Sequence, residues 1–280
     1  MKNPLTKRLP RELRGDIGKY IVIFLFMTML ISLVSGFLVA DNSVYDAYKK
    51  GFDKYNVEYI NFVTADKLSD ETIDKLEKEN KVKIYDQRYY ELKELKRNAT
   101  IRIYGERKNV NKLCVMSGQL AKQDDEIALD RVFAKNNNYK VGDNIKIDKN
   151  TYKITGFIAM PDYSCVFEDN ADMMFDSVNF GVASMTDSGL SKLKKSKLSY
   201  CYAVKYDKEP ESDKKQKDMS DDFLENLSKQ AVVTSYLPRY SNKAINFTGD
   251  DMGGDKAMFI LFDYIVIAIL AFVFAITTSN

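Results

Sequence analysis

The sequence predicts an α+β domain held between two membrane-spanning helices, and three observations lead to this fold class. Two segments are apolar enough to cross a bilayer, and they lie near opposite ends of a chain of 280 residues. The long stretch between them alternates strand-like and helix-like patterns. The composition of the whole chain, 29% charged and 45% hydrophobic, allows most of it to bury a core and stay soluble.

The first apolar segment covers residues 20–40, YIVIFLFMTMLISLVSGFLVA, and carries no charged side chain. A helix of about 20 apolar residues crosses the hydrocarbon core of a bilayer. A signal peptide also begins with basic residues and an apolar run, but its run is usually shorter and ends at a small-x-small cleavage site. Leu38-Val39-Ala40-Asp41 is a poor site of that kind. We therefore expect residues 20–40 to remain as transmembrane helix 1.

The flanks of this helix predict its orientation. Residues 1–19 contain six basic and two acidic residues, whereas the first charged residues after the helix are Asp41 and Asp46. Basic flanks stay on the cytoplasmic side. The sequence therefore predicts a cytoplasmic basic lead-in over residues 1–19, an extracytoplasmic domain over residues 41–257, and a multi-pass protein of the cell membrane.

The second apolar segment, MFILFDYIVIAILAFVFAITT, covers residues 258–278 and predicts transmembrane helix 2. Asp263 is its only Asp, Glu, Lys or Arg. A charged side chain within a span is often functional, but Asp263 lies near the start of this segment and could reach the interface instead, so both interpretations stay open. The sequence ends at Asn280 without a basic flank, and we expect the protein to continue beyond it.

Both apolar segments carry small residues at helical spacing. Such stripes let helices approach closely in a membrane. Two stripes in one chain favour a packed bundle over isolated anchors. The stripe residues are Thr28, Ser32, Gly36 and Ala40 in the first segment, and Ala268, Ala271, Ala275 and Thr278 in the second.

The domain between the spans begins with a strand, a helix and a strand. Residues 57–63, VEYINFV, are rich in β-branched and aromatic side chains. Ser69 is a typical N-cap, and the acidic residues that follow it favour a helix start. Residues 81–90, KVKIYDQRYY, predict one strand that completes the unit.

The same order recurs near the far end, with strands at 199–206 and 231–237 and a helix around 221–229. We expect the two units to pair, with an inserted β-rich subdomain at about 105–195 between them. The predicted fold class is therefore an α+β extracytoplasmic domain, built of two strand–helix–strand units with an inserted β-rich subdomain, between two transmembrane helices.

The insertion has its own local signals. Ile127–Leu129 predicts a short strand, and Asp130 predicts the N-cap of a helix that starts at Arg131. Gly142-Asp143 predicts a turn. The alternating segments on either side of residues 148–150 predict a hairpin with one buried face.

This order of strand, short helix, Val141-Gly142-Asp143, hairpin and Gly156 resembles the extracytoplasmic core domain of MacB-like and FtsX-like ABC transporter permeases. In that family the domain also follows the first span and precedes the second. The lead-in NPLTKRLPRELRGDIGKY, residues 3–20, is similar to that of Gram-positive members. The arrangement is the specific feature, because Val-Gly-Asp alone occurs in many proteins.

The resemblance implies a permease subunit that couples ATP hydrolysis in a separate cytoplasmic ATPase to movement of the extracytoplasmic domain. It implies that ATP binds in that partner and that this chain holds no cofactor, in keeping with the absence of a GxxxxGK[ST] phosphate loop. It also implies a dimer of permease units in the lipid bilayer. An extracytoplasmic peptide, drug or lipid would be exported, or a cell-wall protein controlled. The further spans of the family are missing from this sequence.

Composition argues against other classes of protein. The chain has no His, the usual acid/base group at neutral pH and a common metal ligand, so we expect no enzyme and no metal site. A net charge of +2 gives no reason to expect a nucleic-acid partner. The acidic run at residues 168–176 lacks the spacing of a calcium loop. Cys114, Cys165 and Cys201 are more typical of small buried residues than of a disulfide framework.

Two further questions are left open by the residues themselves. Phe167, Met173, Met174 and Phe175 could form an adaptable partner surface or belong to the core. A two-span membrane receptor with an extracytoplasmic sensor domain would show the same order of segments. It would continue after Asn280 into a signalling helix, whereas a permease would continue into further spans.

Overall fold

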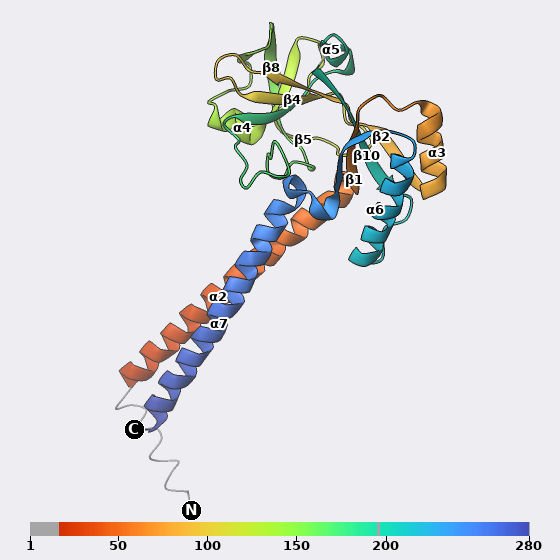
Figure 1. The fold of residues 1–280 in the computed structure, drawn as a ribbon. Helices are drawn as coiled ribbons and strands as arrows, with labels where there is room; N and C mark the ends of the chain where they lie inside the picture. The colour runs from red at the N-terminus through yellow and green to blue at the C-terminus, as the bar shows by residue number, and fades with distance from the viewer. Residues whose placement is uncertain (1–16, 195–196, 280) are drawn as a thin grey trace, which may run out of the picture. The chain divides into compact units, whose positions relative to one another are not determined.

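The computed structural model describes residues 17–194 and 197–279 of the chain. Two long helices lie at the ends, α2 (Ile17–Lys54) and α7 (Lys243–Ser279). The chain divides into two compact units. One is formed by the terminal segments that contain most of these helices, and the other is the domain of residues 49–248 (Figure 1).

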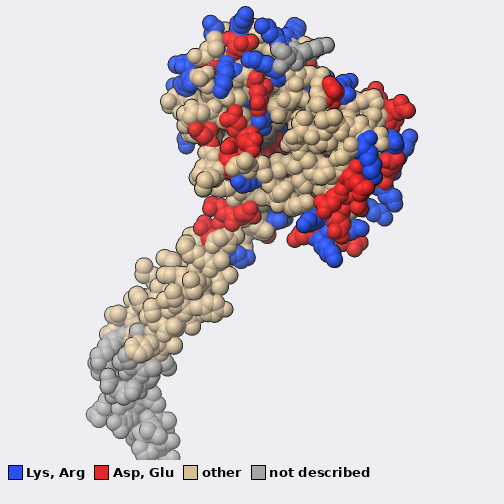
Figure 2. Space-filling model, viewed as in Figure 1, with Lys and Arg blue, Asp and Glu red and all other residues tan. Residues whose placement is uncertain are grey.

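Within the described residues, one helix is long and apolar enough by length and composition to cross a membrane, Tyr20–Lys54. It contains the segment 20–40 predicted from the sequence and continues fourteen residues past Ala40. The continuation carries Asp41, Asp46, Lys49, Lys50, Asp53 and Lys54. On the face that Figure 2 draws, a long stretch of the helix pair shows no Lys, Arg, Asp or Glu. The hydropathy of residues 20–40 predicts the apolar part of the helix, but it does not predict that the helix continues to Lys54.

Helices α2 and α7 pack against each other in antiparallel directions. The rings of Phe37 and Phe259 lie 3.6 Å apart between centroids. Lys256 Nζ donates to Asn42 Oδ1 over 2.9 Å. Further along, a Cβ added to Gly249 would lie 2.7 Å from the Tyr48 ring. Because the α7 partner number falls as the α2 number rises, the two helices run in opposite directions.

One part of the domain, here called the αβ half, contains two strand–helix–strand units. The first is β1 (Ile60–Thr64), α3 (Asp70–Asn80) and β2 (Val82–Asp86). The second is β10 (Leu198–Tyr206), α6 (Asp213–Ser228) and β11 (Val233–Pro238). The strands pair antiparallel in the order β11-β1-β10-β2, the order of a split β-α-β fold.

Helices α3 and α6 cover this half with a shared apolar core. Leu76 from α3 and Phe223 and Leu227 from α6 are buried with Phe62 and Tyr202 from the strands. The opposite faces of the two helices carry the acidic and basic side chains that Figure 2 shows over α3 and α6. Each helix buries one face on the sheet, and this shared core holds the two strand–helix–strand units together.

Local signals explain where these helices begin. Ser69 Oγ accepts from Thr72 N over 3.1 Å, as the sequence predicts. Helix α6 begins at Asp213, behind the N-cap Ser212, and not around residue 221. Its first two turns are polar and show no apolar period, so only the cap could have indicated this start.

The other part of the domain, here called the inserted half, is a mixed sheet. Its strands follow the order β3-β4-β9-β6-β8-β5, with β7 beside β8. The pairs β4–β9 and β6–β8 are parallel and the others antiparallel. The strands are β3 (Tyr89–Lys93), β4 (Thr100–Tyr104), β5 (Cys114–Gly118), β6 (Glu126–Asp130), β7 (Asn144–Ile147), β8 (Asn150–Ala159) and β9 (Phe180–Ser184), with helices α4 (Arg131–Asn136) and α5 (Asp187–Ser191). The mixed α+β class predicted from the sequence is confirmed.

Residues 81–90 form two strands, not one. The carboxylate of Asp86 accepts from the backbone N of Arg88 over 3.0 Å, which turns the chain between β2 and β3. Strand β2 pairs with Tyr202–Tyr206 of β10, while β3 pairs with Leu198 and Ser199 of the same strand. The inserted half therefore begins at Tyr89, earlier than the expected residue 105.

The predicted elements of the inserted half are present. Asp130 Oδ1 accepts from Val132 N over 2.9 Å and from Phe133 N over 2.8 Å, and so caps α4. Strands β7 and β8 form the hairpin around Asp148, whose φ is 51°. Gly156 lies where a Cβ would come within 2.4 Å of Gln119 O, so the close approach of β5 requires a glycine.

Candidate functional site

The two halves of the domain are joined by backbone hydrogen bonds between two short segments. Lys112 N donates to Tyr55 O over 2.8 Å, and Asn111 N donates to Asn56 O over 3.1 Å. The side chain of Asn56 donates to Asn109 O over 2.7 Å. The segment after β4 is thus fastened to the segment that enters β1.

A buried glutamate lies at this junction. Asn111 Nδ2 donates to Glu58 Oε2 over 2.9 Å, and Asn61 Nδ2 donates to Glu58 Oε1 over 3.2 Å. Glu58 is almost completely buried. Burial, reinforced by the charge of Asp162, raises the pKa of Glu58 to about 8. The carboxyl group therefore holds its proton at neutral pH.

Next to it lies a buried ion pair. Arg107 Nη1 donates to both carboxylate oxygens of Asp162, over 2.7 and 2.9 Å, and the two side chains are 2% and 4% exposed. The guanidinium also lies 3.9 Å from the centroid of the Tyr104 ring. Removing one member of such a pair leaves the other charge buried and uncompensated, which is strongly destabilising.

The polar network continues through tyrosine hydroxyls. The hydroxyls of Tyr104 and Tyr163 lie 2.8 Å apart, and Arg102 Nη1 donates to Tyr163 over 2.6 Å. Arg102 Nε in turn donates to Glu91 over 2.8 Å. A cavity of about 360 Å³ borders this network from Glu58 to Arg102. The arrangement holds a proton on Glu58 at the junction of the two halves.

This network holds no feature of a metal centre. Over residues 17–194 and 197–279, no group of three or more His, Cys, Asp or Glu side chains could hold a metal ion. Each cysteine sulfur has a different neighbour. Tyr55 donates to Cys114 over 3.1 Å, Cys165 lies 3.6 Å from Thr248 Oγ1, and Cys201 lies 3.4 Å from Asn61 Oδ1.

The small-residue stripe of α2 lies on the exposed side of that helix. Thr28, Ser32, Gly36 and Ala40 are all exposed, and a Cβ added to Gly36 would meet nothing within 4 Å. The more covered positions of the apolar stretch are 23, 27, 30 and 34. The stripe is therefore not the surface through which α2 contacts α7.

The corresponding residues of α7 are only partly described. Ala268 and Ala271 are exposed and Asp263 is half-buried. The side chains of Ala275 and Thr278 lie outside the described ones.

The four residues predicted as either partner surface or core fall into two groups. Phe167 is 3% exposed, and its ring packs against Phe175 and Phe247 with centroids 5.7 and 5.5 Å away. Met173 and Met174 are 91% and 66% exposed. Phe167 therefore belongs to the core, and Phe175 is half-buried against it. The exposed part of this segment is the methionine pair.

Sequence reasoning did not single out the network around Glu58. One signal was present, because a glutamate stands inside the apolar run VEYINFV, where a buried carboxyl needs partners. Arg107 lies in the polar segment GERKN, which gives no sign of burial. Its partner Asp162 is 55 residues away and meets it only in the folded domain.

Comparison with known proteins gives structural neighbours only. No protein-family model and no curated protein matches the sequence. The chain is similar to the periplasmic region of MacB from Actinobacillus actinomycetemcomitans, with 14% identity and a TM-score of 0.38 over 68% of this chain and 92% of that one. It is also similar to the extracellular domain of the noncanonic ABC-type transporter YknZ from Gram-positive bacteria, with 12% identity and a TM-score of 0.35 over 63% and 99%.

A third neighbour is a Bacillus anthracis protein described as a lipoprotein, with 10% identity, a TM-score of 0.32 and coverage of 63% of this chain and 95% of that one. The neighbours thus include extracytoplasmic domains of ABC-type transporters. At these TM-scores the likeness carries no argument about mechanism or substrate.

Proposed function

We propose that this chain is part of the permease subunit of an ABC transporter, in which ATP hydrolysis by a separate cytoplasmic ATPase moves the extracytoplasmic domain. One observation carries the proposal. The apolar helix Tyr20–Lys54 leads with only five intervening residues into β1, and the chain leaves the domain through α7, a second long helix that packs antiparallel beside α2.

The proposed topology has two spans, residues 20–40 and 258–278, with the N-terminus in the cytoplasm and residues 41–257 outside. The basic lead-in supports this orientation. The domain between the spans comprises two strand–helix–strand units with an inserted β-rich subdomain.

The partners of the spans follow from their free surfaces. The stripe Thr28, Ser32, Gly36 and Ala40 is exposed in the α2–α7 pair and has small side chains that admit a close neighbour. We infer that it packs against further helices of the permease or of a second permease unit. The cargo would be a peptide, drug or lipid, or the output would be control of a cell-wall protein.

Orientation can be tested by labelling single cysteines. In a chain with its three native cysteines replaced by serine, Ser228→Cys on α6 should react with a membrane-impermeant thiol reagent in intact cells. The matched variant Asn3→Cys in the lead-in should react only after permeabilisation. Labelling of Asn3→Cys in intact cells would contradict the proposed topology.

Transport coupling needs a second measurement. The full-length protein should co-purify with an ATPase subunit and raise its ATP hydrolysis in lipid nanodiscs. Co-purification of a signalling kinase, without an ATPase of this type, would favour the two-span receptor instead.

A further inference from the structure

Helix α7 contains a segment whose residues are poor helix formers. Residues 249–255, GDDMGGD, hold three aspartates and all three glycines of this continuous helix. Glycine is the weakest helix former after proline, and aspartate ranks low among the other residues. Asp251 and Asp255 also stand four residues apart, a spacing at which like charges repel each other on a helix. The intrinsic stability of α7 is therefore lowest in this segment.

Packing does not explain two of these glycines. A Cβ added to Gly253 or to Gly254 would meet nothing within 4 Å, and both residues are exposed. Of the three, only Gly249 has a close neighbour, since a Cβ there would come within 2.7 Å of the Tyr48 ring. Alanine would fit at the two open positions and would favour the helix. What glycine provides there instead is backbone freedom.

The turn of α7 that precedes this segment is fastened to the domain. Ser164 Oγ donates to Ala244 O and to Ile245 O, each over 2.9 Å. Ile245 is completely buried. The Phe247 ring packs against Phe167 with the two centroids 5.5 Å apart. This turn therefore belongs to the packed structure of the domain.

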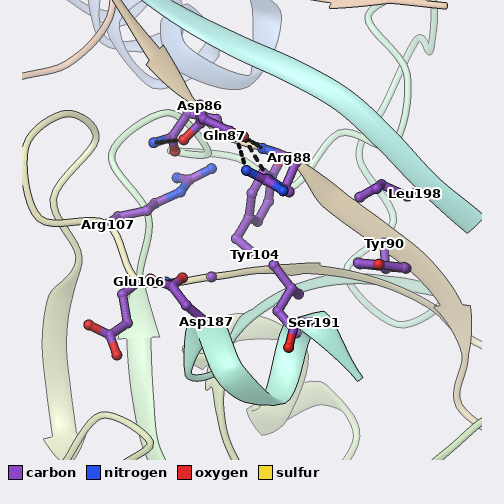
Figure 3. Close-up of a pocket in the computed structure, with 12 residues that line it drawn as sticks. Asp86, Gln87, Arg88, Tyr90, Tyr104, Glu106, Arg107, Asp187, Ser191 and Leu198 are labelled. Atoms are coloured by element: carbon purple, nitrogen blue, oxygen red, sulfur yellow. Dashed lines mark hydrogen bonds and ion pairs between the residues drawn. The ribbon is translucent and has the colours of Figure 1, made fainter. Parts of the chain in front are cut away.

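The domain that holds this turn is closely packed where its two halves meet. Figure 3 shows the cavity of about 410 Å³ at this meeting place, with Arg88 hydrogen-bonded to Asp86 beside it. Tyr90 and Tyr104 in its lining are each 3% exposed, and the Arg107 guanidinium lies 3.9 Å from the centroid of the Tyr104 ring. A change of angle inside the domain would break such contacts, whereas the two open glycines of α7 have no side-chain contact to lose.

The part of α7 that follows the segment is fastened to α2. Lys256 Nζ donates to Asn42 Oδ1 over 2.9 Å, and the rings of Phe259 and Phe37 lie 3.6 Å apart between centroids. The division between the two compact units of the chain falls directly before Gly249. The glycine segment thus stands between a turn held by the domain and a stretch held by α2.

We propose that residues 249–255 are a hinge within α7, at which the membrane part of the helix changes its angle to the turn held by the domain. The open glycines supply the backbone freedom. The fastened stretches on either side concentrate the bending in these seven residues. The inference goes beyond the transporter proposal, because it concerns a movement within this chain that requires no ATPase.

Hydrogen–deuterium exchange of the full chain in lipid nanodiscs tests whether the segment opens. The reference is the stretch of α2 from Asn42 to Tyr48, whose two end residues lie against Lys256 and Gly249. Because the two stretches lie side by side, a difference in exchange reflects the helix and not its distance from the bilayer. We expect the amide protection factors of residues 250–256 to be at least about tenfold below those of the reference.

Alanine variants link this opening to the glycines. Gly253→Ala combined with Gly254→Ala should raise the protection factors of the segment about 20-fold, since each change favours the helix. Gly36→Ala, at an equally open position of α2, is the matched control and should leave them unchanged.

Distances between spin labels, measured by electron paramagnetic resonance, test whether the opening changes the angle. The labels are placed on Ser228→Cys in α6 and Ala257→Cys in α7, both exposed positions, in a chain whose three native cysteines are replaced by serine. We expect a broad distribution of distances that the double alanine variant narrows. Two results would overturn the proposal: protection in the segment equal to that of the reference, or a distribution that is as narrow in the parent as in the double variant.

Discussion

Replacing Glu58 by glutamine should stabilise the domain at neutral pH and remove most of its pH dependence between about pH 5 and 8. The pKa of this carboxyl is about 8 in the folded domain, against an ordinary value of 4.5. Folding therefore takes up a proton throughout this range. The stability linked to Glu58 is complete below pH 4.5 and is lost as the pH rises through the folded-state pKa near 8.

The size of this loss of stability follows from the difference between the folded-state and unfolded-state pKa values of Glu58. Each pH unit above 4.5 costs about 1.4 kcal/mol of stability while the folded group keeps its proton. At pH 7 the cost is about 3 kcal/mol, and glutamine, which has no proton to take up, avoids it.

The hydrogen bonds of the site admit the amide. The glutamine oxygen can replace Oε2 and accept from Asn111 Nδ2, which donates there over 2.9 Å. The amide nitrogen would then face Asn61. Rotating the Asn61 amide turns its oxygen toward this new donor, at the expense of the weak contact from Cys201 Sγ over 3.4 Å. The protonated carboxyl group of Glu58 makes the same demand.

Urea unfolding of the full chain at pH 5, 6, 7 and 8, followed by far-UV circular dichroism, checks the prediction; the chain has no Trp to report by fluorescence. Glu71→Gln, in the exposed first turn of α3, is the matched control and should keep the parent's pH dependence. If Glu58→Gln unfolds at lower urea than the parent at pH 7, or shows the parent's slope with pH, Glu58 is ionised in the folded domain and the reasoning is wrong.

Three further substitutions probe the packing of the domain. Asp162→Asn leaves Arg107 buried without its counter-charge and should cost about 3 to 5 kcal/mol, measured by urea unfolding. Gly156→Ala forces a Cβ to within 2.4 Å of Gln119 O and should cost about 1 to 3 kcal/mol, with a lower melting temperature. Phe167→Ala empties a position in the aromatic cluster and should cost about 3 to 5 kcal/mol by the same unfolding assay.

Each of these has a control in the same chain. Asp86→Asn breaks a half-exposed ion pair and should cost about 1 kcal/mol or less. Gly253→Ala meets nothing within 4 Å and should not destabilise α7. Met173→Ala, at an exposed position, should stay within about 0.5 kcal/mol of the parent. Equal losses in a test variant and its control would show that the contacts named here are not what holds the domain together.

Local features of this chain could be predicted from the sequence because their causes lie within a few residues. The apolar run at 20–40 fixes a helix that can cross a membrane. Ser69 and Asp130 cap the helices that follow them, since a cap needs only a side-chain oxygen beside the first free backbone N–H groups. The hairpin around Asp148 follows from alternation and a turn.

Other features depend on residues that are distant in the sequence, and only the tertiary structure decided them. The break of residues 81–90 into β2 and β3 reflects pairing with two parts of β10, more than 100 residues later. Phe167 could have been surface or core until its ring met Phe247, 80 residues away. Glu58, Arg107 and Asp162 come together from three separate segments, and burial at their meeting point raises the pKa of Glu58. From the sequence alone a polar side chain is expected at the surface. The hydrogen-bond and ionic partners that offset the cost of burying it come from distant segments and meet it only in the folded domain.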